Sequence, residues 1–285
     1  MAKMIPMNMV TPPPELAAIT ALQSKLVSAL RPILPEHALL WEPEDTIPYE
    51  CDGLAAYRRM PLAVALPETE EQVAKILKIC FEMQVPIVPR GSGTGLSGGA
   101  MPISQGLVLS LAKLKKIISI DPFTRTAVVQ PGVRNLAISE AVAHLGLYYA
   151  PDPSSQIACS IGGNVNENSG GVHCLKYGLT LHNVLKVRGI LMNGEIVEFG
   201  SLAPDSPGLD LLAIVMGSEG MLAVVTEVTV KLIAKPKLAR VIMASFDDIE
   251  KGADAVAAII AAGIIPAGLE MMDKATTRAV EEFVH

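Results

Sequence analysis

The chain has 285 residues, half of them hydrophobic, and a formal net charge of −6. This length favours two domains and provides enough apolar residues for a sizeable core. The acidic balance and the scattered Lys and Arg residues argue against nucleic acid as a partner, because nucleic-acid-binding surfaces gather basic residues.

The cysteines and the apolar runs indicate the compartment. The four cysteines show neither CxxC spacing nor a disulfide framework, which is typical of a reducing, cytoplasmic environment. The N-terminus lacks the apolar region of a signal peptide. The most membrane-like run, 255–269, contains Gly263 and Pro266 and is too short to span a bilayer, so we expect no transmembrane segment.

The first part of the chain alternates helices and strands. Apolar residues recur along one side of 14–31, which predicts a helix, and an irregular segment follows to residue 56. Thr69 is a favourable N-cap for the next helix, because its hydroxyl can accept from a free N–H group. The β–α–β pattern indicates an α/β or α+β domain. The elements expected after residue 56 are a strand over 62–66, a helix over 69–83 and a strand over 85–88.

A glycine-rich loop follows, with the sequence Pro-Arg-Gly-Ser-Gly-Thr-Gly-Leu-Ser-Gly-Gly over residues 89–99. Glycine lets the backbone approach a ligand closely, and successive N–H groups can converge on one anion. A flexible linker is the alternative, but the Arg and the flanking strand-like runs favour a loop that binds a pyrophosphate. The candidate binding residues are Arg90, Gly91, Ser92, Gly93, Thr94, Gly95, Leu96, Ser97, Gly98 and Gly99.

The same loop contains the spacing Gly93-x-Gly95-x-x-Gly98, which also occurs in the dinucleotide fingerprint. That fingerprint requires a helix to open within it, whereas here Pro102 follows shortly after the glycines. An acid about 20 residues further on that could bind a ribose in a βαβ unit is also missing. We therefore expect no Rossmann NAD site, and no Walker A motif is present.

The middle of the chain is rich in strands. The dipeptide Asn193-Gly194 between two apolar runs is a strong hairpin signal. The expected elements are strands over 106–111, 116–120, 126–130, 184–192, 195–199 and 222–232, and helices over 135–145 and 209–216.

A second long loop covers residues 151–171. We expect Ser160 to cap a short helix over 161–168, whose free N–H groups and positive dipole end would form another anion site. Gly162 and Gly163 would let a phosphate or a flat ring approach. The turn over 217–220 is a third loop of small residues, and three such loops in one domain indicate a large cofactor.

After residue 235 the pattern begins again. This piece shows too few strands to close a sheet, so we expect residues 236–285 to be the start of an incomplete second domain. Its expected elements are strands over 241–245 and 269–272 and helices over 249–262 and 274–284.

Three stretches together resemble the FAD-linked oxidases of the vanillyl-alcohol-oxidase/p-cresol-methylhydroxylase type. They are the loop over 89–99, Pro-Asp-Pro-Ser-Ser-Gln-Ile-Ala-Cys-Ser-Ile-Gly-Gly-Asn over 151–164, and Gly-Ser-Glu-Gly-Met-Leu-Ala-Val-Val-Thr-Glu-Val over 217–228. Further points are Tyr49-Glu-Cys-Asp-Gly53, Val172-His-Cys-Leu-Lys-Tyr-Gly178 and Gly268-Leu-Glu-Met-Met-Asp273. The resemblance covers nearly the whole chain after the first few tens of residues.

The resemblance implies an α+β fold, with a two-subdomain FAD-binding domain over 57–235 followed by the start of a truncated α+β cap domain. FAD would lie between the subdomains, with its pyrophosphate on the loop over 90–99. The 151–171 segment would follow the isoalloxazine and ribityl, and Glu219 and Gly220, together with Val225, would lie near the adenine side. The further FAD-binding residues implied are Pro131, Gly132, Pro151, Asp152, Ser155, Ser160, Ile161, Gly162, Gly163, Asn164, Asn168, Gly170, Gly171, Glu219, Gly220 and Val225.

The implied reaction is oxidation of a small 2-hydroxy acid, glycolate or D-lactate, to the 2-oxo acid by hydride transfer to flavin N5. Electrons would pass to partner subunits or a quinone-linked acceptor. The implied partners are a second FAD-binding subunit and an iron–sulfur subunit, which could hold this cytoplasmic chain at the inner membrane. A D-2-hydroxyglutarate-type dehydrogenase and a non-catalytic FAD-binding fragment stay open as alternatives.

The histidines bear on two further points. Some members of the family bond the flavin to a His in the first loop; residues 89–99 contain none, so we expect non-covalent FAD. The five histidines show no HxH or ligand-spaced pair, so the family's His-rich metal motif is missing and we expect no metal site. His173 and Lys176 are the titratable residues expected near the flavin, and the catalytic residues stay unassigned. We expect a truncated chain to be inactive alone.

Overall fold

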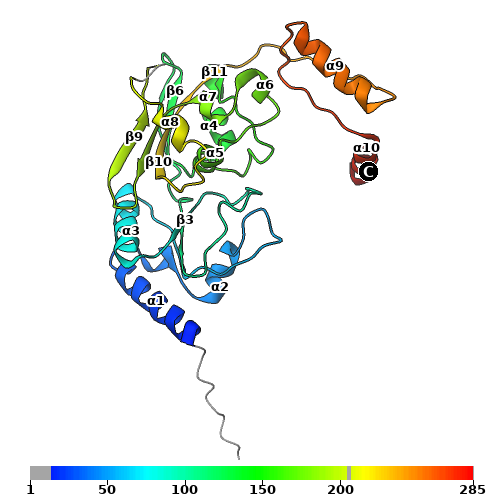
Figure 1. Cartoon of the computed structure of the whole chain (residues 1–285). Helices are drawn as coiled ribbons and strands as arrows, with labels where there is room; N and C mark the ends of the chain where they lie inside the picture. The colour runs from blue at the N-terminus through cyan, green and yellow to red at the C-terminus, as the bar shows by residue number, and fades with distance from the viewer. Residues whose placement is uncertain (1–13, 204–206, 285) are drawn as a thin grey trace, which may run out of the picture. The chain divides into compact units, whose positions relative to one another are not determined.

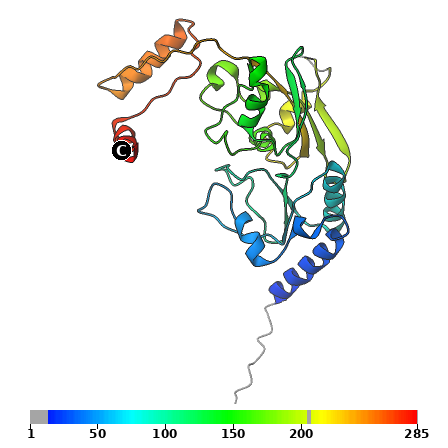
Figure 2. The same cartoon turned by 180° about the vertical axis from the view of Figure 1, so that it is seen from behind.

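The computed structural model describes residues 14–203 and 207–284 and divides into two compact units. Unit 1 comprises residues 1–113 with the turn 191–195, and unit 2 comprises residues 114–190 and 196–285. Each unit combines helices with strands (Figures 1 and 2). The α+β fold class is therefore confirmed.

Unit 1 contains a four-stranded sheet with the order β1-β2-β4-β3. The strands β2 (Ala63–Ala65), β4 (Leu107–Ser110) and β3 (Ile87–Arg90) are parallel, and β1 (Leu39–Leu40) pairs with β2 in antiparallel fashion. Every residue of β2 and β4 is buried, as expected for strands in the middle of a parallel sheet.

Two longer helices complete the core of unit 1. Helix α3 (Glu70–Met83) buries Val73, Ile76, Leu77 and Cys80, a spacing that places them on one face. Its N-terminus carries the predicted cap, since Thr69 Oγ1 accepts from Gln72 N at 3.2 Å. The second longer helix is α1 (Pro14–Leu30), and the shorter helical elements are η1 (Glu36–Ala38), α2 (Pro43–Thr46) and η2 (Ile47–Tyr49).

Unit 2 contains a five-stranded antiparallel sheet with the order β5-β6-β10-β8-β9. The predicted hairpin is present, with Gly194 at φ +86° and its N–H donating to Leu191 O at 2.9 Å. The strands are β5 (Ile117–Asp121), β6 (Thr126–Val129), β8 (Val184–Ile190), β9 (Ile196–Gly200) and β10 (Val224–Lys231), and β7 (Leu147–Tyr148) pairs separately with β11 (Ile233–Ala234).

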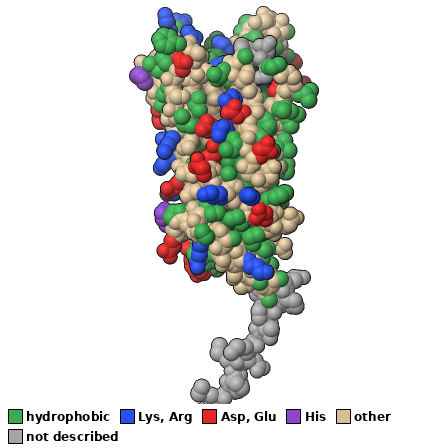
Figure 3. All heavy atoms as spheres, turned by 90° about the vertical axis from the view of Figure 1, so that its left-hand side faces the viewer, with side chains coloured by type: hydrophobic (Ala, Val, Ile, Leu, Met, Phe, Trp, Pro, Cys, Tyr) green, Lys and Arg blue, Asp and Glu red, His purple; other side chains and the backbone are tan. Residues whose placement is uncertain are grey.

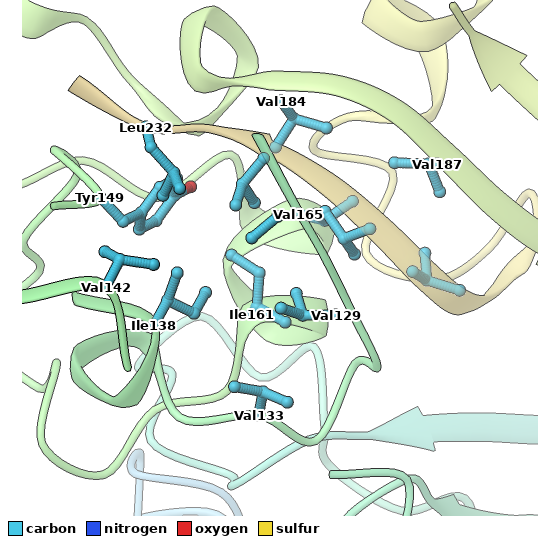
Figure 4. Close-up of a cluster of buried hydrophobic side chains, with 14 of the residues drawn as sticks. Val129, Val133, Ile138, Val142, Tyr149, Ile161, Val165, Val184, Val187 and Leu232 are labelled. Carbon is cyan, nitrogen blue, oxygen red and sulfur yellow. The ribbon is translucent and has the colours of Figure 1, made fainter. Parts of the chain in front are cut away.

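Short helices pack on this sheet and share one apolar core with it. Figure 4 shows Ile161 and Val165 of one helix among Val129, Val133 and other core side chains. These residues are nearly or fully buried, so the core fixes the segments that connect them. The helices that contribute to this core are α4 (Asn135–Val142), α5 (Ile161–Glu167), α7 (Thr180–Asn183) and α8 (Leu211–Val215), and unit 2 also contains η3 (Ala143–Leu145) and α6 (Cys174–Tyr177).

The C-terminal part departs from the sequence prediction. The helices α9 (Ile249–Ala261) and α10 (Lys274–Val284) are present, but the strands expected over 241–245 and 269–272 are wrong. Val241 and Met243 are 94% and 93% exposed. Apolar residues favour a strand only when another strand offers backbone groups to pair with, and these segments pair with no strand among the described residues.

Charges of both signs are interspersed on the face drawn in Figure 3. Within the β8–β9 hairpin, Lys186 Nζ lies 3.0 Å from Glu198 Oε2. None of the helices in the described ranges is long and apolar enough to cross a membrane.

Candidate functional site

The glycine-rich loop begins where β3 ends, at the carboxyl edge of the parallel strands of unit 1. Gly93 and Gly98 take φ values of +68° and +80°, which side chains with a Cβ rarely adopt. In the described part of the chain, the N–H groups of residues 91–99 donate no hydrogen bond to protein acceptors. A row of N–H groups without protein acceptors on a loop of small residues can bind an anion such as a diphosphate.

Arg90 occupies a different position from the one its sequence context suggested. An Arg at the start of a phosphate-binding loop would be expected to reach toward the ligand, but Arg90 is only 8% exposed. Its Nη1 atom donates to Cys51 O at 2.7 Å and to Ala100 O at 3.3 Å. Burial lowers the pKa of the Arg90 guanidinium, whereas the nearby charge of Asp52 raises that pKa.

The segment Tyr49–Gly53 packs against this loop, a contact that sequence reasoning missed. The Arg90 Cζ atom lies 5.6 Å from the centre of the Tyr49 ring. A Cβ placed on Gly53 would lie 2.7 Å from Gly95 O and 2.9 Å from Thr94 O, so only glycine fits there. The one signal in the sequence was the presence of this segment among the points of family resemblance.

The helix expected after Ser160 is present as α5, but its N-terminus differs from the prediction in two ways. Ser160 makes no capping hydrogen bond, and its Oγ atom is buried without a partner. The N–H groups of Ile161 and Gly162 donate to Val133 O at 2.8 Å and Pro131 O at 2.9 Å. These two groups are therefore not free to bind an anion, because tertiary contacts have taken them.

The predicted residues Pro131, Gly132 and Gly162 lie together in unit 2. A Cβ on Gly162 would lie 2.6 Å from Pro131 Cβ, so this glycine allows α5 to pack on Pro131 rather than admitting a ligand at that point. Gly132 N donates to Leu114 O at 2.7 Å. Gly163 has more room, since the nearest atom to its added Cβ is Ser160 Oγ at 3.5 Å.

Buried side-chain amides fix the start and the middle of the 151–171 segment. Asn135 Nδ2 donates to Pro151 O at 3.1 Å and to Asn164 Oδ1 at 3.0 Å. Asn164 Nδ2 lies 3.4 Å from both Cys159 Sγ and Ser169 Oγ. Asn164 was predicted, whereas Asn135 was missed because it lies 29 residues away in the sequence.

Asp152 joins the two ends of the same segment. Its Oδ2 atom lies 2.6 Å from His173 Nδ1, and its Oδ1 atom accepts from His173 N at 3.2 Å. A Cβ on Gly171 would lie 2.3 Å from Asp152 O, which explains the glycine. The His173 ring also lies 6.5 Å from the Tyr177 ring, while Lys176 Nζ lies 5.5 Å from the same ring.

The third loop contacts the C-terminal end of α5. Gly217 N donates to Val165 O at 2.9 Å, and Glu219 N donates to Asn166 O at 2.9 Å. The loop bends back sharply, with Glu219 and Gly220 at φ +54° and +76°. Asn168 is also left-handed, at φ +50°, and ends the helix.

The remaining predicted residues of unit 2 differ in exposure. Val225 is fully buried in the core, so its side chain does not face a ligand, although its backbone belongs to the irregular part of β10. Ser155, Gly170, Asn168 and Gly171 are partly exposed, and Asn168 Oδ1 accepts from Leu181 N at 3.0 Å.

No group of three or more His, Cys, Asp or Glu side chains in residues 14–203 and 207–284 could hold a metal ion.

The sequence matches two known families. Residues 61–200 match the family described as FAD binding domain, and residues 235–285 match FAD linked oxidases, C-terminal domain. Glycolate oxidase subunit GlcD of Escherichia coli (strain K12) is 60% identical over 92% of this chain and 53% of its own length. D-2-hydroxyglutarate dehydrogenase of Xanthomonas citri is 33% identical over 90% of this chain and 53% of its own length. The chain thus spans about half the length of the curated relatives it matches.

A solved structure shares the fold. Alkyldihydroxyacetonephosphate synthase superimposes with a TM-score of 0.74 over 86% of this chain and 47% of the other, at 20% sequence identity.

Proposed function

The chain belongs to the FAD-linked oxidases, and from this premise we propose that it is the flavin-binding part of a 2-hydroxy-acid dehydrogenase acting on glycolate or D-lactate. The observation that carries the proposal is the row of N–H groups over residues 91–99, which meet no protein acceptor among the described residues, on a loop with two left-handed glycines. Such a loop suits a diphosphate, which FAD contains.

The residues proposed to hold FAD differ in what they supply. The loop over 91–99 would bind the pyrophosphate through backbone N–H groups and the hydroxyls of Ser92, Thr94 and Ser97. The 151–171 segment would supply a rigid wall for the flavin ring and ribityl, since α5 is fixed in the core. Glu219 and Gly220 would lie near the adenine. When bound, FAD supplies the oxidant that accepts a hydride at N5.

Oxidation of a 2-hydroxy acid also requires a base that takes the hydroxyl proton and a cation that binds the substrate carboxylate. Within the described residues Arg90 does not provide that cation, because its guanidinium is buried on backbone carbonyls. The His173–Asp152 pair is oriented by two hydrogen bonds and is the best-defined titratable pair of the 151–171 region. We assign it no catalytic role.

The wider assignments are part of the same proposal. We propose that residues 57–235 form the FAD-binding domain and that 236–285 begin a substrate-binding domain. By likeness to the glycolate oxidase subunit, a second FAD-binding subunit and an iron–sulfur subunit are the proposed partners. The relative that acts on D-2-hydroxyglutarate makes that acid the second candidate substrate.

The test is to purify the chain, saturate it with FAD and mix it anaerobically with glycolate, D-lactate and D-2-hydroxyglutarate in turn. Bleaching of the flavin absorbance by glycolate or D-lactate supports the first candidate, and bleaching by D-2-hydroxyglutarate alone supports the second. Bound flavin that no acid bleaches would restrict this chain to FAD binding, the outcome expected for a chain that spans about half the length of its relatives. Failure to bind FAD would overturn the proposal.

The same preparation shows whether FAD is bound covalently or non-covalently. Residues 89–99 contain no His, so FAD should be held without a covalent bond. Acid precipitation should then release the yellow chromophore into the supernatant. Colour retained in the protein pellet would contradict non-covalent binding.

A further inference from the structure

The glycine-rich loop is folded around the side chain of Arg90. The guanidinium donates from Nη1 to Cys51 O at 2.7 Å and to Ala100 O at 3.3 Å. Ala100 directly follows the loop, and Arg90 directly precedes it. One side chain therefore joins the two ends of the loop to each other and to a segment 39 residues upstream.

The backbone of the loop lies directly against this cation. A Cβ added to Gly93 would lie 2.3 Å from Arg90 Nη2 and 2.5 Å from Cζ. These distances are far shorter than a van der Waals contact, so the chain passes the guanidinium as closely as a glycine allows. Gly93 also has φ +68°, which turns the loop around the cation.

The surroundings of Arg90 favour a fixed position for its charge. The Tyr49 ring lies 5.6 Å from Arg90 Cζ, within the range of a cation–π interaction. Asp52 is 7% exposed; its Oδ1 atom accepts from Leu54 N at 2.8 Å, and its Oδ2 atom is buried without a hydrogen-bond partner. The negative charge of Asp52 thus lies near a guanidinium that stays protonated at any ordinary pH.

We propose that Arg90 is a positioning residue that shapes the loop for a diphosphate and does not itself contact the phosphates. The guanidinium holds the loop in the shape in which its N–H groups meet no protein acceptor among the described residues, and the cation adds a positive potential close to them. The inference rests on the proposed binding of FAD, because FAD supplies the diphosphate.

In the competing interpretation, Arg90 binds the phosphates directly. The two interpretations differ in whether lysine can take the place of Arg90. A direct ligand acts as a charge, so Lys would substitute for it in large part. A positioning guanidinium acts through its planar fork of donors to two carbonyls, which an ammonium group on a flexible stem does not reproduce.

The first experiment measures the Kd of FAD by fluorescence titration for the wild-type chain, Arg90→Lys and Arg90→Met, with thermal unfolding as a check on folding. We expect both variants to weaken FAD binding by about tenfold or more and to agree with each other within about threefold. If Arg90→Lys binds within about threefold of wild type while Arg90→Met does not, Arg90 is a direct ligand and the inference is overturned.

A double-mutant cycle tests the contact with the loop. Gly93→Ala should weaken FAD binding strongly when Arg90 is present and much less in the Arg90→Met background, because the added Cβ then meets a side chain that can move. Additive effects of the two substitutions would contradict the inference.

If the variants fold poorly, a measurement on the wild-type chain tests whether Arg90 contacts FAD. In an NMR spectrum of the chain, the Arg90 side-chain N–H signals should show slow rotation before FAD is added and should change little on binding. Large shifts of these signals on FAD binding would overturn the inference. If the wild type binds FAD and Arg90→Met binds equally well, only the inference fails; if the wild type binds no FAD, the proposed function fails with it.

Discussion

The two loops that the sequence singled out for the cofactor use their backbone in opposite ways. In the described residues, the loop over 91–99 leaves its N–H groups without protein acceptors and is shaped by one buried guanidinium. In the 151–171 segment, the N–H groups of Ile161 and Gly162 are already bonded to carbonyls, and Asn135 ties the segment down. The first loop therefore keeps backbone donors that a ligand can use, whereas the donors at the start of α5 are already used within the protein.

The largest expected effect is the loss of FAD from the first loop. Gly93→Val places a branched side chain at φ +68° and against Arg90 Nη2. The strain and the clash together should weaken FAD binding by at least about a hundredfold. The measurement is flavin occupancy and Kd, with circular dichroism to confirm that the chain is folded.

Gly98→Val, which introduces the same side chain, is the matched control for that substitution. Gly98 has φ +80° but nothing within 4 Å of an added Cβ, so only the backbone strain of about 1–2 kcal/mol remains. An affinity for FAD as low as that of Gly93→Val would show that the contact with Arg90 is not what makes Gly93 sensitive. Wild-type occupancy in Gly93→Val would remove this loop from the site.

Substitutions that release the 151–171 segment should instead lower the free energy of unfolding. Asn135→Ala removes the donors to Pro151 O and Asn164 Oδ1 and leaves both acceptors buried. The free energy of unfolding should fall by about 2–4 kcal/mol. Denaturant titration measures this, and Asn135→Asp, which keeps the size but loses the donating amide group, should be destabilised at least as much. A change below about 1 kcal/mol in both variants would show that these hydrogen bonds do not hold the segment.

A smaller effect with opposite signs is expected for two neighbouring glycines of α5. Gly162→Ala meets Pro131 Cβ at 2.6 Å and should lower the free energy of unfolding by about 1–2 kcal/mol. Gly163→Ala has its nearest contact at 3.5 Å and should be neutral or stabilising by up to about 1 kcal/mol, because Ala is the better helix former. Equal effects at the two positions would mean that α5 moves freely relative to Pro131.

Local patterns in the sequence predicted much of this fold. The capping of α3 by Thr69, the hairpin at Asn193-Gly194 and the glycine-rich loop each depend on neighbouring residues, and the structure contains all three. The strand expected over 241–245 failed because a strand also needs a partner, which the residues themselves do not specify.

The contacts that define the candidate site could not be found in the same way. The hydrogen bond from Arg90 to Cys51 O spans 39 residues, and the bond from Asn135 to Asn164 spans 29. The N-terminus of α5 offers free N–H groups when considered alone, yet Val133 O and Pro131 O accept two of them. Tertiary packing decides such partners, and a single sequence gives no periodic signal for them.

The central claim is that the backbone of residues 91–99 binds the diphosphate of FAD, and amide hydrogen–deuterium exchange tests it most directly. We predict that amide exchange at residues 91–99 is markedly slower with saturating FAD than without it. Ile161 and Gly162 should exchange slowly in both states, because their N–H groups are already bonded to Val133 O and Pro131 O. Unchanged exchange over 91–99 in a chain that demonstrably holds FAD would contradict the claim.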